Sequence, residues 1–336
     1  MEKKMSKFRV WLFGFILIIG IPGFADDKPV LTIYAPDYFA SEWGPGPTIK
    51  ESFEEICSCA VNYVTGNLLP RLLLEGEKTE ADIVIGIDTD ISKAAKETGL
   101  FEKHGQNNEQ LTLPIQWTDE IFLPFDWSYL AFVYDNSKLL TPPKSFEELV
   151  AAPDSLKIII QDPRTSISGL SLALWVKAVF GSKASEVWSK LSPKIVTVTK
   201  GWSEAYGMFV AGESDMVLSY STSPAYHLIA EGDQSKSAAI FSEGHYMTVE
   251  LVGKIRTSKN EYLANQFMKF VLSETFQKAI PTTNWVYPAA LSADKLPQVF
   301  IELPKPKRGI LYNENEAAEI REEAIRDWIT GLTSKY

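Results

Sequence analysis

The sequence predicts an α/β fold with two doubly wound α/β lobes that are joined by two crossing strands. Short apolar segments typical of buried strands alternate with helical segments, and this alternation implies a mostly parallel sheet in each lobe. Two longer strand-like segments, 125–135 and 245–254, are placed to leave the first lobe and to return to it. The length of 336 residues also favours two lobes over one. We expect lobe 1 to comprise 26–126 and 249–300, lobe 2 to comprise 127–248, and a C-terminal helical segment, 301–336, to belong to either lobe.

Each expected element has a local signal. Alternating apolar and polar residues mark the first strand, Pro47 is placed to start the first helix, and Gly76 and Gly99 are placed to end the next two. We expect strands at 29–34, 61–64, 81–86, 125–135, 158–160, 195–198, 216–219 and 245–254. We expect helices at 48–56, 68–74 and 91–98, one starting after Ser145, one ending at Phe180, and others at 202–210, 262–279 and 317–332.

The N-terminus has the three regions of a secretory signal peptide. A basic stretch that ends at Arg9 precedes the apolar run 10–21, and small residues follow up to Ala25. A membrane anchor is the alternative, but the apolar run is shorter than the roughly 20 residues that span a bilayer. We therefore expect cleavage after Ala25 and export of a soluble chain to the periplasm.

Charge and cysteine content narrow the function further. The net charge of −10 becomes more negative when the basic leader is removed, which argues against nucleic acid and anionic lipid as partners. The two cysteines, Cys57 and Cys59, are more often paired than free in an exported protein, with a metal site as a weaker alternative. No sequence motif for catalysis, nucleotide binding or metal binding stands out, so we expect no enzyme activity, cofactor or metal.

Aromatic residues beside Gly, Ser, Thr and Pro are the most informative feature. Trp202, Tyr220 and Tyr226 have such neighbours, as do the segments 38–47 and 284–288. Aromatic residues in these settings tend to line wet clefts rather than cores. Several of them converging on one interlobe cleft would form a box for a flat, cationic ligand.

These segments carry a resemblance to a known family. The stretches 43–47, 161–166, 197–207, 218–227, 241–246 and 279–288 together resemble the periplasmic thiamine-binding proteins of bacterial ABC transporters, over nearly the whole mature chain. The resemblance implies a type II periplasmic-binding fold, binding of thiamine, thiamine monophosphate or thiamine diphosphate, and delivery to a membrane permease by a monomer. It implies ligand contacts from Trp43, Ser166, Trp202, Tyr220, Tyr226 and Trp285.

The resemblance is incomplete near the first strand. An aromatic residue that the family often has there is Pro36 in this chain, and Tyr38 is our candidate to replace it. Trp285, Tyr226 and Tyr38 would then stack on the flat rings of the ligand.

The polar parts of the ligand need other groups. The helix start that contains Thr165 and Ser166 would take the hydroxyl or phosphate end, although Ser166 could also serve only as a cap. Arg164 could pair with Asp162 without touching ligand. Asp37, Asp126 and Glu243 are candidates for the aminopyrimidine, and His227 and His245 are expected to be structural.

Two other functions remain open. A thiamine-cleaving transferase can share this fold but needs a cysteine nucleophile. A receptor for ferric ion would use Tyr220 and Tyr226 as phenolate ligands, a site in which Trp202 and Trp285 make poor sense.

Overall fold

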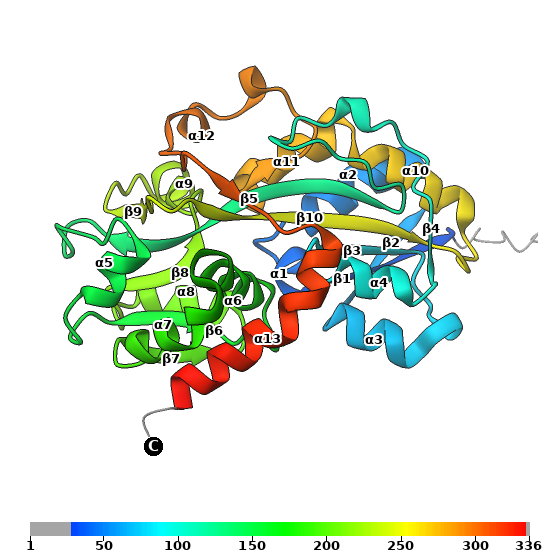
Figure 1. Cartoon of the computed structure of the whole chain (residues 1–336). Helices are drawn as coiled ribbons and strands as arrows, with labels where there is room; N and C mark the ends of the chain where they lie inside the picture. The colour runs from blue at the N-terminus through cyan, green and yellow to red at the C-terminus, as the bar shows by residue number, and fades with distance from the viewer. Residues whose placement is uncertain (1–27, 334–336) are drawn as a thin grey trace, which may run out of the picture.

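Residues 28–333 are described by a computed structural model, and they form two α/β lobes that share two long strands (Figure 1). The expected signal peptide and its cleavage site after Ala25 lie outside the described residues. Within this range, no helix is both long enough and apolar enough to cross a bilayer.

The strands of the described chain are β1 (Val30–Ala35), β2 (Ala60–Thr65), β3 (Ile83–Asp88), β4 (Phe101–Glu102), β5 (Phe122–Asp135), β6 (Ile158–Gln161), β7 (Ile195–Thr199), β8 (Met216–Tyr220), β9 (Lys236–Ala239), β10 (His245–Ile255), β11 (Tyr287–Pro288) and β12 (Gly309–Ile310). The α-helices are α1 (Asp37–Ala40), α2 (Gly46–Cys57), α3 (Leu68–Glu75), α4 (Ser92–Glu97), α5 (Phe146–Ala151), α6 (Ile167–Phe180), α7 (Ala184–Leu191), α8 (Trp202–Val210), α9 (Pro224–Tyr226), α10 (Glu261–Val271), α11 (Glu274–Thr283), α12 (Gln298–Glu302) and α13 (Glu314–Thr333).

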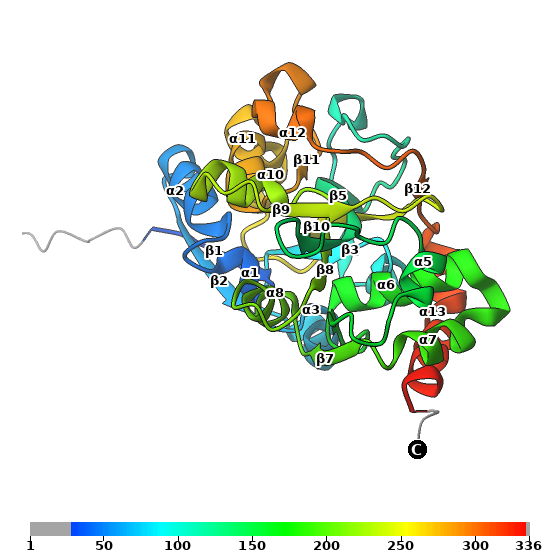
Figure 2. The ribbon, with the colours of Figure 1, turned by 90° about the vertical axis from the view of Figure 1, so that its left-hand side faces the viewer.

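The strand order β2-β1-β3-β10-β5-β8-β6-β7 confirms the predicted fold class. The strands β2, β1 and β3 are parallel to one another in lobe 1, and β8, β6 and β7 are parallel in lobe 2. The long strands β5 and β10 are antiparallel to each other and cross from one lobe to the other (Figures 1 and 2). This arrangement brings the carboxyl ends of β3 and β8 toward the junction between the lobes, where ligands of open α/β sheets bind.

Some helix boundaries agree with the sequence prediction and one does not. Helix α8 has the predicted bounds, and α6 ends at Phe180 as expected. The single helix expected over 262–279 is wrong, because the Ser273 hydroxyl accepts a hydrogen bond from the Phe276 amide and starts a second helix, α11. The sequence patterns also missed α7 and the short strand β9.

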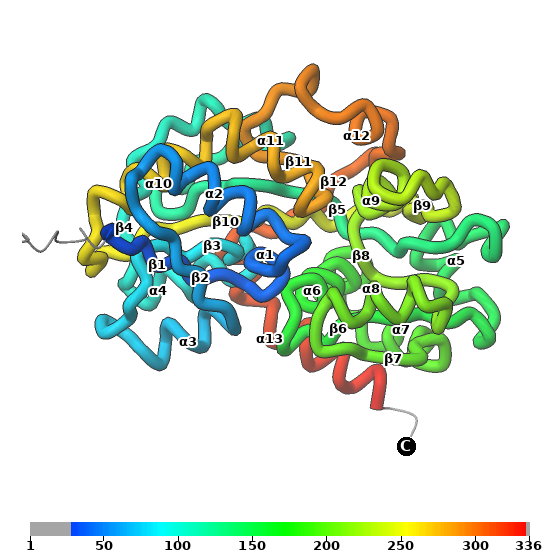
Figure 3. The backbone as a smooth tube through the Cα atoms, turned by 180° about the vertical axis from the view of Figure 1, so that it is seen from behind, coloured from blue at the N-terminus to red at the C-terminus, as the bar shows by residue number. Residues whose placement is uncertain are grey.

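The C-terminal helix α13 connects the two lobes. It packs mainly on α6 and α7 of lobe 2, where Gly331 allows close contact with Trp188. Lys177 of α6 donates to Glu323 and Asp327 of α13 at 2.6 and 2.8 Å. At the other end of α13, Glu314 accepts from Lys96 of α4, in lobe 1, at 2.6 Å. In Figure 3, which views the molecule from behind, α13 extends past both lobes.

Candidate functional site

Two aromatic pairs join residues of opposite lobes. Trp43, between α1 and α2, lies 6.4 Å from Trp202 of α8, measured between ring centroids. Tyr226 of α9 meets Trp285, which follows α11, edge to face at 5.2 Å. Four of the six residues that the resemblance singled out are therefore paired across the lobe junction.

The backbone at Trp285 is unusual for a bulky residue. Its φ is +60°, in the left-handed region that favours glycine. The residue before it, Asn284, donates to the Asp126 carboxylate at 2.6 Å and to Glu250 at 3.4 Å. The left-handed backbone at Trp285 thus places the Trp285 ring next to Asn284, which binds the carboxylates. Strained backbone of this kind is common at functional sites.

Tyr38 and Tyr220 lie beside carboxylates. The Tyr38 hydroxyl donates to Glu250, and burial together with Glu250 and Asp126 raises the pKa of Tyr38 well above its ordinary value. Burial, Glu250, Asp126 and Asp88 raise the pKa of Tyr220 in the same way. Both phenols are therefore neutral hydrogen-bonding groups at physiological pH.

The carboxylates in question occupy three neighbouring strands. Asp88 ends β3, Glu250 lies opposite it in β10, and Asp126 of β5 lies opposite Glu250 on the other side. Burial first, and then the neighbouring carboxylates, raise the pKa of Asp88 and of Asp126 well above the ordinary value, and burial also raises the pKa of Glu250. We call Asp88, Glu250 and Asp126 the carboxylate row.

Asp90 connects this region to lobe 2. Its carboxylate accepts from Tyr246 at 2.6 Å and from Ser171 of α6 at 2.7 Å. Burial raises the pKa of Asp90 to about 6. The two hydrogen bonds lower this pKa but do not outweigh burial. Asp90 lies two residues after Asp88, the last residue of β3, so this end of the strand is close to both the carboxylate row and the opposite lobe.

The start of α6 has the predicted polar groups. The Ser166 hydroxyl caps the helix by accepting from the Gly169 amide at 3.4 Å, and it lies 3.0 Å from the Ser168 hydroxyl. Thr165 is exposed and donates to the Lys200 carbonyl at 2.8 Å. The nearby Trp202 indole N–H donates to Ser219 Oγ at 2.8 Å.

Arg164 is paired as expected. Its guanidinium donates to both Asp162 oxygens, at 2.9 and 2.5 Å, and lies over the Trp328 ring of α13 at 5.6 Å. The Arg164 guanidinium therefore has a structural partner, as expected for a residue that does not contact ligand.

Other candidates lie elsewhere or are exposed. Glu243 accepts from the Phe146 amide at 2.8 Å and supports the start of α5, which is a structural role. Asp37 is exposed in the first turn of α1. His245 is buried between the Leu130 carbonyl and the Phe241 amide, and burial lowers its pKa to about 4, consistent with a structural role.

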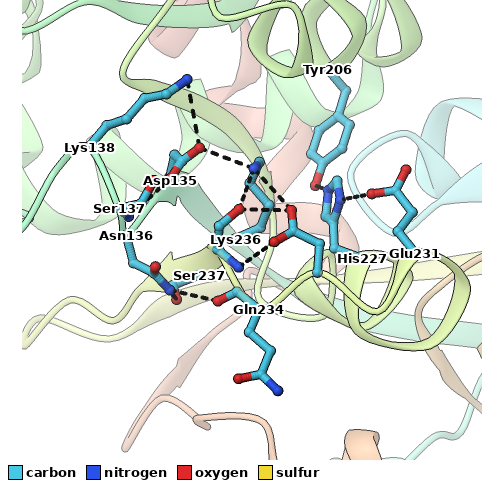
Figure 4. Close-up of polar contacts among 12 residues, drawn as sticks. Asp135, Asn136, Ser137, Lys138, Tyr206, His227, Glu231, Gln234, Lys236 and Ser237 are labelled. Atoms are coloured by element: carbon cyan, nitrogen blue, oxygen red, sulfur yellow. Dashed lines mark hydrogen bonds and ion pairs between the residues drawn. The ribbon is translucent and has the colours of Figure 1, made fainter.

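His227 belongs to a separate polar cluster in lobe 2 (Figure 4). Its ring lies 3.0 Å from the Tyr206 hydroxyl and 2.6 Å from Glu231. His227, Glu231 and Asp233 are close enough to share a metal ion, but Asp233 is bonded to Ser235 and Lys236. These hydrogen bonds indicate that the cluster has a structural role.

The two cysteines form the expected disulfide. Cys57, at the end of α2, is bonded to Cys59, just before β2. Because the sequence contains two cysteines, no thiol is left in the chain.

Sequence reasoning missed two members of the carboxylate row, Asp88 and Glu250. Glu250 is an acidic residue between apolar neighbours in β10, and Asp88 is the last residue of the buried strand β3. An acid in such a strand was the available signal, since an unpaired buried carboxylate is rarely structural.

Comparison with known proteins identifies the family. Residues 51–305 match the family model described as "Bacterial extracellular solute-binding protein". The chain is 49% identical over 317 residues to a "Thiamine-binding periplasmic protein" of Salmonella typhimurium, with 93% of this chain and 96% of the relative covered. It is 47% identical over 317 residues to the protein of the same description from Escherichia coli, with the same coverage.

A solved structure described as "Periplasmic thiamin binding protein" has the same fold. It superposes with a TM-score of 0.88 at 47% identity and covers 91% of this chain and 97% of its own. The chain therefore belongs to the bacterial extracellular solute-binding proteins, in the family that contains these thiamine-binding periplasmic relatives.

Proposed function

We propose that this protein is a periplasmic receptor that binds thiamine and its mono- and diphosphate between its lobes and delivers them to an ABC permease. The observation that carries the proposal is the meeting of aromatic rings from both lobes beside carboxylates that form no ion pair within residues 28–333. A flat ring system with a positive charge matches both features. The printed names of the relatives at 47–49% identity support the same ligand and compartment.

Each part of thiamine has a candidate partner. Trp285 and Tyr226, together with Tyr38, offer ring faces and hydroxyl groups for the two flat rings. A desolvated cation over an aromatic face contributes about 2 kcal/mol, so two or three such contacts would support tight binding. Among the acids that the sequence singled out, the exposed Asp37 is the candidate for the aminopyrimidine, whereas Asp126, which already accepts from Asn284, belongs to the carboxylate row.

The hydroxyl or phosphate end would lie at the start of α6. Ser166 and Thr165 supply hydroxyls there, and backbone N–H groups at a helix start attract anions. Trp43, Trp202 and Tyr220 would complete this end of the site. The capping bond of Ser166 is compatible with this role, because a hydroxyl can accept one hydrogen bond and donate another.

Lobe closure would couple binding to transport. Both ring pairs use one residue from each lobe, so a ligand held by both pairs stabilises the closed form over the open one. The permease would then recognise the closed lobes.

The alternative functions fit the site less well. A thiamine-cleaving transferase needs a thiol nucleophile, and both cysteines are joined in the disulfide. A ferric receptor needs phenolate ligands, but burial and neighbouring carboxylates raise the pKa of Tyr220 well above its ordinary value.

A titration tests the proposal directly. The full-length chain would be expressed in a bacterium and the exported protein purified. It would then be titrated with thiamine, thiamine monophosphate and thiamine diphosphate while heat and tryptophan emission are recorded. We expect saturable one-to-one binding and recovery of intact ligand by mass spectrometry. Absence of heat, of emission change and of any rise in melting temperature at saturating concentrations would refute the function, and recovery of cleaved thiamine would favour the transferase. The mass of the exported protein will show whether the chain begins at Asp26.

A further inference from the structure

The carboxylate row is built by the crossing of the lobes. In register, Glu250 of β10 faces Asp88 of β3 on one side and Asp126 of β5 on the other. Residues paired in this way project from the same face of a sheet, with side chains roughly 5 Å apart. Three carboxylates therefore stand side by side, an arrangement that costs stability when they are ionised.

The strand pairing is irregular at this point. The β5–β10 ladder shifts register between Glu250 and Leu251 and leaves out Phe125, and the β3–β10 ladder shifts one residue later, between Leu251 and Val252, and leaves out Gly86. Gly86 has a φ of +90°, and a Cβ atom there would lie 2.6 Å from the Pro36 ring. Such bulges are common beside functional sites, where they redirect side chains.

No positive group balances the row. Within residues 28–333, none of its three members forms an ion pair with Lys, Arg or His. The titratable groups that face it are Tyr38 of α1, Tyr220 of β8 and Asp90, all neutral or acidic. A buried carboxylate without a cation costs several kcal/mol unless it takes up a proton.

One oxygen in the row has no hydrogen-bond partner among residues 28–333. Asp88 is 1% exposed, and its Oδ1 accepts from the Ile91 amide at 3.3 Å, whereas its Oδ2 accepts no hydrogen bond from this part of the chain. Buried polar atoms are nearly always satisfied, so an unpartnered carboxylate oxygen beside two further acids indicates a site for a positive group.

We propose that Asp88, Glu250 and Asp126 form a cation subsite that takes the positively charged ring of the ligand. The proposal rests on the proposed function and specifies which part of the ligand this region recognises. Tyr38 and Asn284 connect the row to the aromatic residues, since Tyr38 donates to Glu250 and Asn284 adjoins Trp285. A planar cation lying against these rings would neutralise the row without needing hydrogen bonds to all three acids.

An organic cation fits the row better than a metal ion does. A metal requires ligand atoms that converge on one point. Among the described residues, the group whose carboxylate and imidazole atoms all lie within 4.8 Å of one another is His227, Glu231 and Asp233, and the row is not such a group. The three carboxylates of the row lie side by side on neighbouring strands, and this spread of negative charge matches the delocalised charge of an aromatic cation.

The test compares two ligands of the same shape. In 3-deazathiamine a neutral thiophene replaces the thiazolium of thiamine, so any difference in affinity reports recognition of the charge. We expect the wild-type protein to bind thiamine at least tenfold more tightly. Equal affinity for the two compounds would overturn the cation subsite while leaving the receptor function intact, whereas failure to bind either compound would overturn both.

Isosteric variants locate the recognition. Asp126→Asn and Glu250→Gln remove one charge each, and we expect each to reduce the preference for thiamine over 3-deazathiamine at least threefold. Glu51→Gln, an exposed acid on α2, is the control matched for charge and should leave the preference unchanged. An unchanged preference in both row variants would contradict the assignment. Should a variant fail to fold, as judged by circular dichroism, the comparison of the two ligands on the wild-type protein still decides.

A third ligand separates the charged ring from the aminopyrimidine. Oxythiamine retains the thiazolium but has a carbonyl in place of the amino group. We expect Asp126→Asn and Glu250→Gln to weaken oxythiamine and thiamine by similar factors. If both variants weaken thiamine alone, the row contacts the amino group, and the assignment to the charged ring is wrong.

Discussion

Two aspartates on the same strand show opposite electrostatic behaviour. Asp126 and Asp135 both lie in β5, one in each lobe, and both are buried. Burial and Glu250 raise the pKa of Asp126 well above its ordinary value. Burial acts in the same direction on Asp135, but hydrogen bonds from Ser137 and Lys236 outweigh it and lower its pKa.

The neighbours of each aspartate explain the difference. Asp135 lies 3.1 Å from the Lys236 ammonium and 3.7 Å from the Lys138 ammonium. Figure 4 marks both ion pairs with dashed lines. Asp126 faces another carboxylate across the strand pair. The scaffold therefore balances its charges at the distal end of β5 and leaves them unbalanced where the lobes meet, as a site that awaits a cation would require.

The largest effect on stability is expected at the end of β5 that contains Asp135, where the charges are balanced. Lys236→Met removes a half-buried cation that donates to Asp135 at 3.1 Å, to Asp233 at 3.3 Å and to Ser235 at 2.7 Å. We expect the free energy of unfolding to fall by about 2 kcal/mol, because the buried Asp135 carboxylate loses its nearer charged partner. Urea denaturation measures this loss, and Lys236→Arg should retain most of the stability. Thiamine affinity should not change, and a lower affinity at unchanged stability would show that the distal end also takes part in binding.

The next effect concerns the aromatic residues beside the unbalanced end. Trp285→Ala removes the ring that meets Tyr226 but leaves the backbone able to place Asn284. We expect thiamine affinity to fall at least tenfold, or about 1.4 kcal/mol, with the fold intact. Calorimetry measures the affinity, and Tyr262→Ala, an exposed aromatic on α10, is the control. Unchanged affinity in Trp285→Ala would remove this ring from the site.

The sequence predicted much of the scaffold because its signals are local. Gly201 precedes α8 and Gly181 follows α6, and the two crossing strands are indicated by their length and composition. The split between α10 and α11 was missed because Ser273 fits an amphipathic pattern as well as it fits a cap. A competing local signal, rather than a missing one, caused this error.

The site was predicted only in part because it depends on strand order. Trp202, Tyr226 and Trp285 were recognised from the small polar residues beside them, and Asp126 was one of three candidate acids. The neighbours of Asp126 in the row are far away in the sequence and come together only because β10 lies between β3 and β5. No local pattern encodes that order.

A smaller effect, of opposite sign, is expected at Asp126 itself. Asp126→Asn removes one of two carboxylates that face each other, while its amide can still accept from Asn284 and donate to Glu250. We expect the unliganded protein to gain up to about 1 kcal/mol in unfolding free energy at neutral pH, the upper end for one cross-strand pair. Urea denaturation tests this gain, and a loss of stability would mean that the row is a structural cluster like the one around Asp135.

The smallest effect is the pH dependence of that gain. Because the folded-state pKa of Asp126 is raised, its contribution to stability is fully present below the ordinary carboxyl value and is lost as the pH rises through the raised value. The asparagine does not titrate, so its advantage over wild type should be small at about pH 5 and larger at about pH 7.5. Titrating groups remote from Asp126, such as His245, are common to both proteins and cancel in the difference. Saturating thiamine should abolish the advantage, since a bound cation favours the ionised carboxylate. An advantage that is independent of pH and unaffected by thiamine would show that Asp126 carries no proton in the unliganded protein and meets no positive charge in the complex.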